Sequence, residues 1–91
     1  MKRIKVRYDD FLVIENTLNV VTDNCNSITF ENIGTDNATI LDNIPLLPGE
    51  IRQFNNFPGE IIPDPFKIRF ADMDPDKQIL VIREFKDIID L

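Results

Sequence analysis

The residues that most often carry out chemistry in proteins are scarce in this sequence. The chain contains no histidine and a single cysteine, Cys25. Serine and cysteine nucleophiles usually depend on a neighbouring histidine, and most zinc sites contain one. Asp and Glu are plentiful, but their spacing singles out no pair for general acid–base catalysis. We therefore predict that the protein is not an enzyme and that it binds no cofactor.

One acidic run has the spacing of a metal site. Asp72, Asp74 and Asp76 match the first three ligand positions of a calcium-binding loop. The match then ends, because Lys77 replaces the turn glycine and Arg83 replaces the acid that closes the site with two oxygens. We predict a solvated turn here and no metal site.

A pair of aromatic residues offers a second kind of chemistry. Phe54 and Phe57 flank Asn55 and Asn56, and an exposed aromatic ring beside amides can stack on a sugar and hydrogen-bond to it. The chain has no Trp and only one Tyr, which are the usual platforms for sugars. We therefore predict that both Phe rings pack in the core, with a carbohydrate-binding module kept as an alternative function.

The length and the net charge of the chain limit its domain number and the remaining classes of function. A chain of 91 residues predicts one domain, residues 1–91, with a thin core. The net charge of −6 argues against nucleic-acid binding, although Lys2, Arg3, Lys5 and Arg7 precede every acidic residue. A single cysteine allows no internal disulfide, and no secretory signal or membrane-spanning run is recognised. We expect synthesis in a cytoplasm, no membrane partner and no small-molecule substrate.

The elements that position these residues are expected to be short β-strands. Apolar residues alternate with polar ones in several segments, no segment shows a sustained helical period, and all six prolines fall between residues 45 and 75. The fold class predicted is all-β, a small antiparallel β-sandwich or barrel, immunoglobulin-like or jelly-roll-like. The expected strands are residues 2–8, 11–14, 18–21, 28–31, 38–41, 44–47, 51–54, 66–70 and 78–85.

Local patterns predict how some of these strands connect. Residues 28–31 and 38–41 are interpreted as a hairpin, because Gly34 to Asn37 are turn residues. Asp9 and Asp10 are expected to form a turn, and Lys86 to Leu91 either a helical turn or a frayed end. The side chains expected in the core are Ile28, Phe30, Ile40, Phe66, Ile68 and Phe70.

Two segments are apolar on both alternating faces, Phe11 to Ile14 and Ile79 to Ile82. A sheet of a thin sandwich has one inward face, so the outer apolar side chains should contact a partner. The predicted interface consists of Leu12, Ile14, Leu80 and Ile82, with salt-sensitive contributions from Arg3, Lys5 and Arg7.

The run from Ser27 to Glu50 resembles a known family. Its Asn32-Ile33-Gly34-Thr35 segment and its Leu46-Leu47-Pro48-Gly49-Glu50 turn are similar to small β-sandwich proteins in the virions of tailed bacteriophages, those of Bacteroidetes-type hosts among them. The resemblance implies a virion structural protein, either a capsid-associated decoration protein or a small head-to-tail or tail component. Its partners would be other virion proteins or copies of itself. The alternative from another class is an acidic phage-encoded inhibitor that mimics nucleic acid.

Overall fold

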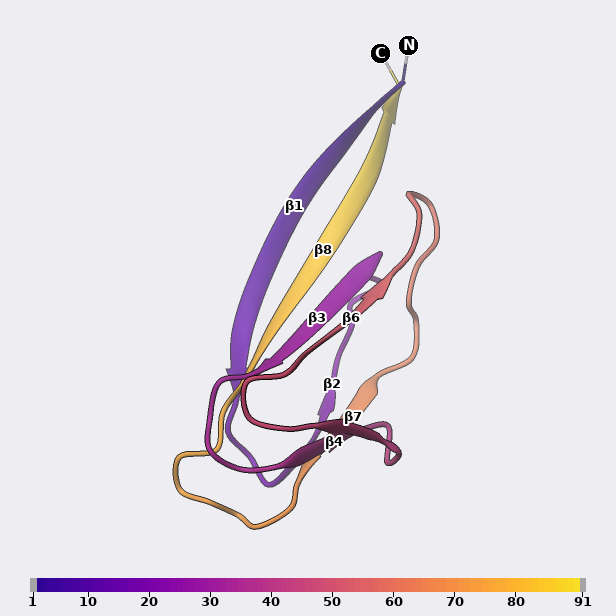
Figure 1. Cartoon of the computed structure of the whole chain (residues 1–91). Coiled ribbons are helices and arrows are strands. Elements are labelled where there is room, and N and C mark those ends of the chain that lie inside the picture. Colours follow the sequence, from indigo (N-terminus) through magenta and orange to yellow (C-terminus); the bar gives the residue numbers. More distant parts are fainter. Residues whose placement is uncertain (1, 91) are drawn as a thin grey trace.

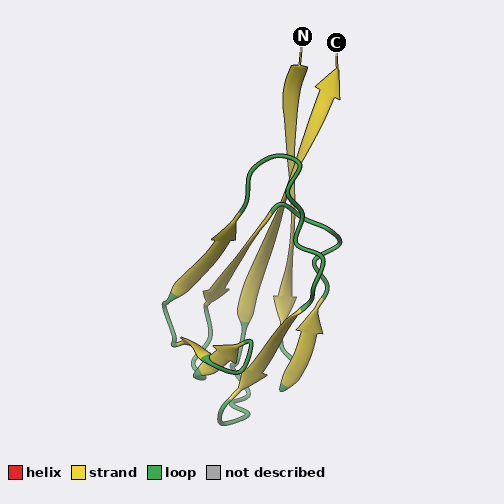
Figure 2. Cartoon of the chain, turned by 90° about the vertical axis from the view of Figure 1, so that its right-hand side faces the viewer, coloured by secondary structure: helices red, strands yellow, loops and turns green. Residues whose placement is uncertain are grey.

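The computed structural model of the protein describes residues 2–90, and every regular element in this range is a β-strand. The strands form two four-stranded sheets that face one another (Figures 1 and 2). They are β1 (Lys2–Val13), β2 (Thr17–Val20), β3 (Ser27–Asn32), β4 (Ala38–Ile40), β5 (Ile44–Leu46), β6 (Ile51–Asn55), β7 (Phe66–Phe70) and β8 (Ile79–Asp90).

The strand order is that of a jelly roll. The first sheet has the order β1-β8-β3-β6, the second sheet has the order β2-β7-β4-β5, and every pairing is antiparallel. The pairs β1–β8, β2–β7, β3–β6 and β4–β5 join the two halves of the chain, as when one long antiparallel ribbon is folded into two layers. The predicted all-β antiparallel sandwich is therefore confirmed.

The core lies between the two sheets and contains the side chains expected from the alternation. All six predicted core residues are at most 7% exposed, and four of them are completely buried. The ring of Phe30 lies at its centre, 5.3 Å from the Phe66 ring and 6.1 Å from the Phe54 ring. The prediction of inward faces from period-two alternation is therefore confirmed on both sheets.

The predicted hairpin between residues 28–31 and 38–41 is wrong. β3 pairs with β6 and β8 in the first sheet, whereas β4 pairs with β5 and β7 in the second. The connecting loop crosses from one layer to the other and is held there by Gly34, whose N–H donates to the Gln78 carbonyl at 3.1 Å. A Cβ on Gly34 would lie 2.4 Å from the Gln78 nitrogen, so this glycine permits a close backbone approach.

The predicted turn at Asp9 and Asp10 is also wrong, because β1 continues through both residues to Val13. The two acids fit a strand for different reasons. Asp10 lies on the outer face, where its side chain is exposed, and Asp9 forms an ion pair with Arg83 on β8. The two segments expected on either side of a turn are thus one twelve-residue strand.

The C-terminal segment is likewise strand. β8 extends to Asp90, so residues 86–90 form neither a helical turn nor a frayed end, and Leu91 lies outside the described residues. Pairing with β1 continues to Lys2 opposite Asp90, and this long pairing holds residues 86–90 extended.

A two-stranded ribbon therefore projects beyond the sandwich (Figures 1 and 2). We define the ribbon as residues 2–7 of β1 and 85–90 of β8, since β3 pairs with β8 only from Ile79 to Glu84. The molecule measures 51 × 19 × 17 Å, and its radius of gyration of 14.4 Å exceeds the value of about 12 Å expected for a compact domain of this length. Two-stranded ribbons have little stability in isolation, so this projection is unusual for a protein that acts alone.

Candidate protein interface

The outer face of the first sheet carries a set of exposed apolar side chains. The register places Leu12 directly opposite Leu80, and Ile4 directly opposite Ile88. Ile51 lies on the same face, because it is opposite Glu31, which is itself opposite Leu80. We call this set the apolar face, and its members are Ile4, Val6, Tyr8, Leu12, Ile51, Leu80 and Ile82. The register also places Asp10, Glu84 and Lys86 on this face, and Ile88 lines a cleft beside Gly59.

The apolar face is open to solvent over most of its length. Leu12 is 50% exposed, Ile51 is 56% exposed and Tyr8 is 65% exposed, while Leu80 and Ile82 are partly buried by their neighbours. Single exposed apolar residues are common, but several of them along one strand typically mark a contact surface. The arrangement therefore suits a protein partner.

The structure brings together only some of the predicted interface residues. Leu12, Leu80 and Ile82 share the apolar face. Ile14 is exposed but follows the end of β1, outside the paired register. The three predicted cations, Arg3, Lys5 and Arg7, lie on the opposite face of β1, because they occupy the odd positions of the strand.

Several residues of the apolar face were not among the predicted interface residues. Ile4, Val6 and Tyr8 alternate with cations, and this pattern indicates a strand without showing whether the apolar side faces a core. Ile51 belongs to a segment with little alternation of its own. Only the sheet register places it on the same face as Leu12 and Leu80.

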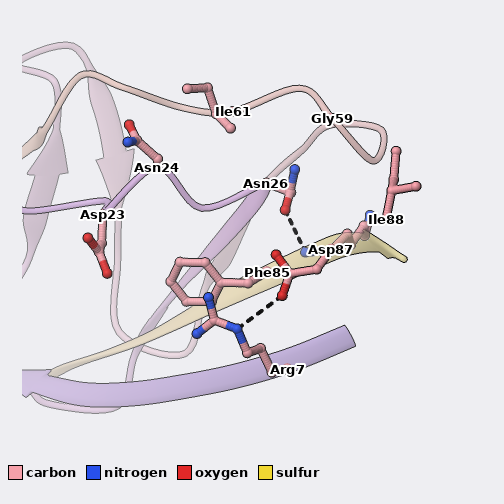
Figure 3. Close-up of a pocket in the computed structure, with 10 residues that line it drawn as sticks. Arg7, Asp23, Asn24, Asn26, Gly59, Ile61, Phe85, Asp87 and Ile88 are labelled. Atoms are coloured by element: carbon pink, nitrogen blue, oxygen red, sulfur yellow. Dashed lines mark hydrogen bonds and ion pairs between the residues drawn. The ribbon is translucent and has the colours of Figure 1, made fainter. Parts of the chain in front are cut away.

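A cleft of about 460 Å³ lies on the other side of the ribbon, between it and the loops that contain Asn24 and Gly59 (Figure 3). Arg7 and Asp87 form its ribbon side, where the Arg7 Nε donates to the Asp87 carboxylate at 3.2 Å. The Arg7 guanidinium also lies 4.3 Å from the centre of the Phe85 ring.

The side-chain amide of Asn26, which also lines the cleft, hydrogen-bonds to two backbone groups. It accepts from the Lys86 N–H and donates to the Glu60 carbonyl. The cleft therefore offers no nucleophile with an adjacent base.

An ion pair fixes the position where the ribbon joins the sandwich. The Arg83 Nε donates to the Asp9 carboxylate at 2.8 Å, and Arg83 Nη1 donates to the Val21 carbonyl at 2.9 Å. The hydrogen bond from Arg83 lowers the pKa of Asp9 below its ordinary range, and the same bond raises the pKa of Arg83. The guanidinium also lies 5.4 Å from the centre of the Phe11 ring. Arg83 Nη2 donates to the other oxygen of the Asp9 carboxylate, so the ion pair is bidentate and holds β1 and β8 together at mid-strand.

The Asp9–Arg83 pair predicts a specific pH dependence of stability. Because the folded-state pKa of Asp9 is lowered, its contribution is present above the unfolded-state pKa and is lost as the pH falls through the folded-state value. Asp9→Asn should therefore lower the free energy of unfolding at about pH 7, and the difference from wild type should shrink below about pH 4.

Urea unfolding of both proteins across this pH range measures the difference. Asp10→Asn is the matched control, since Asp10 is exposed and lies on the other face of β1. The effect of Asp9 will be moderate, because its side chain is 44% exposed to solvent. A difference that stays constant from neutral to acid pH would contradict the assigned role of the pair.

The predicted turn at residues 72–76 is held by a buried carboxylate that sequence reasoning missed. Asp36 is 2% exposed and accepts hydrogen bonds from the backbone N–H of Asp72 and of Asp74, each at 3.1 Å. Within residues 2–90, no group of three or more acidic or cysteine side chains is arranged to hold a metal ion. Asp36 therefore stabilises the loop through backbone hydrogen bonds.

The single cysteine lies in the core. Cys25 is completely buried, and burial raises the pKa of its thiol. A buried thiol with a raised pKa is a poor nucleophile. The residue contributes packing.

The two aromatic residues considered for sugar binding have different environments. Phe54 packs against the core, 4.9 Å from the Phe66 ring, as predicted. Phe57 is 77% exposed, so the prediction that it packs in the core is wrong. The ring lines a hollow of about 350 Å³ together with Asn55, Asn56, Glu60 and Lys86.

Comparison with known proteins gives no relative from which a function follows. No protein-family model, no curated protein and no solved structure matches this chain. Among residues 2–90, no helix is long and apolar enough to cross a membrane. The surfaces of the molecule must therefore carry the functional argument.

Proposed function

We propose that this protein is a structural component of a larger protein assembly and that it acts through contacts of its apolar face. The observation that carries the proposal is the exposure of apolar side chains along β1, next to the partly exposed Leu80 and Ile82 of β8, on the outer side of a sandwich that has its own core. Burying such a face against a partner stabilises the assembly by removing apolar area from water.

We further propose that the assembly is a bacteriophage virion, with the protein as a decoration protein or a small head-to-tail or tail component. Two features support this assignment. The segment from Ser27 to Glu50 resembles small virion β-sandwiches, and the jelly-roll strand order is common among viral capsid domains. The second feature is an analogy of fold, and folds host several functions, so the apolar face remains the main argument.

The proposal predicts that a charge on the apolar face blocks incorporation into particles. Leu12→Lys places an ammonium group opposite Leu80, where an interface would have to desolvate it. The number of copies per purified particle should fall by about tenfold or more, equivalent to at least about 1.4 kcal/mol. Quantitative mass spectrometry of particles assembled with either protein measures this ratio.

Met73→Lys is the matched control, because Met73 is 67% exposed in the loop between β7 and β8, away from the apolar face. Both variants should unfold at the same denaturant concentration as wild type, since both positions are exposed. Equal incorporation of Leu12→Lys and wild type would contradict the proposal, as would absence of the protein from the particles.

A carbohydrate-binding module is a second candidate, favoured by the exposure of Phe57 beside Asn55 and Asn56. Jelly rolls also include lectin domains. Binding to an immobilised polysaccharide that Phe57→Ala abolishes and Leu12→Lys leaves intact would support this candidate. Binding unaffected by Phe57→Ala would remove it.

A further inference from the structure

β1 is a long sheet edge with one partner. It has twelve residues and lies at the end of the first sheet, where β8 is its single neighbour among the described residues. The other edge strands, β6, β2 and β5, have five, four and three residues. Alternate backbone N–H and C=O groups of β1 therefore point away from the sheet and are available to a further strand.

Charge along this edge is divided into two halves. Lys2, Arg3, Lys5 and Arg7 occupy the first half, and Asp9 begins the second. Scattered cations protect an edge from pairing, because an added strand would place like charges together. When the charges are divided in this way, a second copy of β1 that runs antiparallel to the first brings the basic half of each strand beside an acidic residue of the other.

We propose that a second copy of this chain pairs with β1, antiparallel and related by a two-fold axis that passes at Tyr8. The proposal rests on the proposed function as an assembly component and names its first partner. The first sheet of one copy and the first sheet of the other then form one continuous eight-stranded sheet. Such a contact is isologous, so it closes with two copies.

The register centred on Tyr8 gives complementary pairs on both faces. On one face, Arg7 lies opposite Asp9 of the second copy, and the same pair recurs on the other side of the axis. Asp9 is able to take this second cation because its side chain remains 44% exposed while bound to Arg83. On the apolar face, Ile4 lies opposite Leu12 of the second copy, and Val6 lies opposite the exposed Asp10.

Neighbouring registers that keep the two apolar faces on one side are unfavourable. Centring the axis on Arg7 places two guanidinium groups opposite one another, and centring it on Asp9 does the same with two carboxylates. Like charges directly opposite destabilise a strand pair. The sequence of β1 therefore selects the register centred on Tyr8.

The pairing also accounts for the projecting ribbon. In this register, residues 3–7 of each copy pair with residues 9–13 of the other, and residues 9–13 belong to the part of β1 that lies on the sandwich. The ribbon of each copy thus gains a third strand from the body of its partner. A three-stranded arrangement provides the support that an isolated two-stranded ribbon lacks.

Cysteine cross-linking tests the register directly. Tyr8→Cys places two thiols opposite one another across the axis, at a Cα separation of about 4.5 to 5.5 Å that a disulfide spans. We expect mild oxidation to convert most of this variant to a covalent dimer on a non-reducing gel. The native Cys25 does not interfere, because it is completely buried.

Two controls separate the proposed register from random collision. Val21→Cys is matched in exposure, since Val21 and Tyr8 are both 65% exposed, and it should cross-link at least about tenfold more slowly. Val6→Cys and Asp10→Cys, each oxidised alone, should form no covalent dimer on the non-reducing gel. Mixed together they should cross-link, because residue 6 lies opposite residue 10 of the second copy.

A charge reversal provides the second measurement. Arg7→Glu sets a carboxylate opposite Asp9 in both copies, so the dissociation constant from sedimentation velocity should rise at least about tenfold. Arg69→Glu is the matched control, because the Arg69 side chain is 54% exposed and that of Arg7 is 58% exposed. Added salt should weaken the wild-type dimer.

The outcomes separate this inference from the proposed function. A wild-type protein that sediments as a monomer, or a Tyr8→Cys variant that cross-links no faster than Val21→Cys, overturns the pairing. In that case, loss of Leu12→Lys from particles still supports the assembly function. A dimer with the predicted register that never enters particles supports the pairing and overturns the proposed function.

Discussion

Truncation of Phe30 to alanine is expected to lower the free energy of unfolding by about 3 to 5 kcal/mol. Phe30 is completely buried, and its ring lies against Phe54 of the first sheet and Phe66 of the second. Removing it leaves a cavity between the two layers that the paired strands cannot close. The loss is a large share of the about 5 to 15 kcal/mol that stabilises a typical domain.

Chemical denaturation followed by far-ultraviolet circular dichroism measures this difference in the free energy of unfolding. Phe57→Ala is the matched control, because Phe57 is 77% exposed, and its effect should be within about 0.5 kcal/mol. Phe30→Leu should lie between the two variants and keeps the measurement possible if Phe30→Ala does not fold. Equal stability of the three variants would mean that the centre of the core lies elsewhere.

Period-two alternation predicted most of the strand segments and the inward faces of those that form the core. Phe66, Ile68 and Phe70 alternate with cations, and the structure buries all three. The physical reason is local: consecutive side chains of a strand point to opposite faces whatever its neighbours are. The same alternation says nothing about which strands pair, because pairing depends on residues far apart in the chain.

The hairpin prediction failed for this reason. Residues 34–37 have the composition of a tight turn, yet in this jelly roll β3 and β4 belong to different sheets. Gly34 was expected to be part of a tight turn. Its actual role is to let the loop approach the backbone near Gln78, a contact that composition cannot reveal.

The interface prediction was limited in a similar way. Apolar residues on both faces of a segment correctly indicated an outer apolar surface at Leu12 and Leu80. The cations of β1 were grouped with that surface because a basic strand complements the acidic remainder of a neighbouring copy. Odd and even positions of a strand face opposite sides, so Arg7 belongs to the cleft side. Only the register showed that Ile51 joins the apolar face.

The point where the chain crosses between the layers is expected to depend on Asn32. This residue is 1% exposed at the end of β3, and its side chain makes three hydrogen bonds. Its Nδ2 donates to the Asp36 carbonyl at 2.7 Å and to the Leu46 carbonyl at 2.9 Å, and its Oδ1 accepts from the Gly34 N–H at 3.1 Å. The amide thus ties the first sheet to the crossing loop and to β5 of the second sheet.

Asn32→Ala should lower the free energy of unfolding by about 3 kcal/mol, because it leaves buried backbone groups without partners as well as removing three bonds. Denaturant titration measures this loss, with Asn19→Ala as the control, since Asn19 is exposed on β2. If the two alanine variants were equally stable, water or a shifted loop must replace the amide. The crossing between layers would then be held by backbone contacts such as the one from the Gly34 N–H to the Gln78 carbonyl. A selective loss at Asn32 would instead show that one buried amide directs the chain from the first sheet to the second, against the hairpin that its neighbouring residues favour.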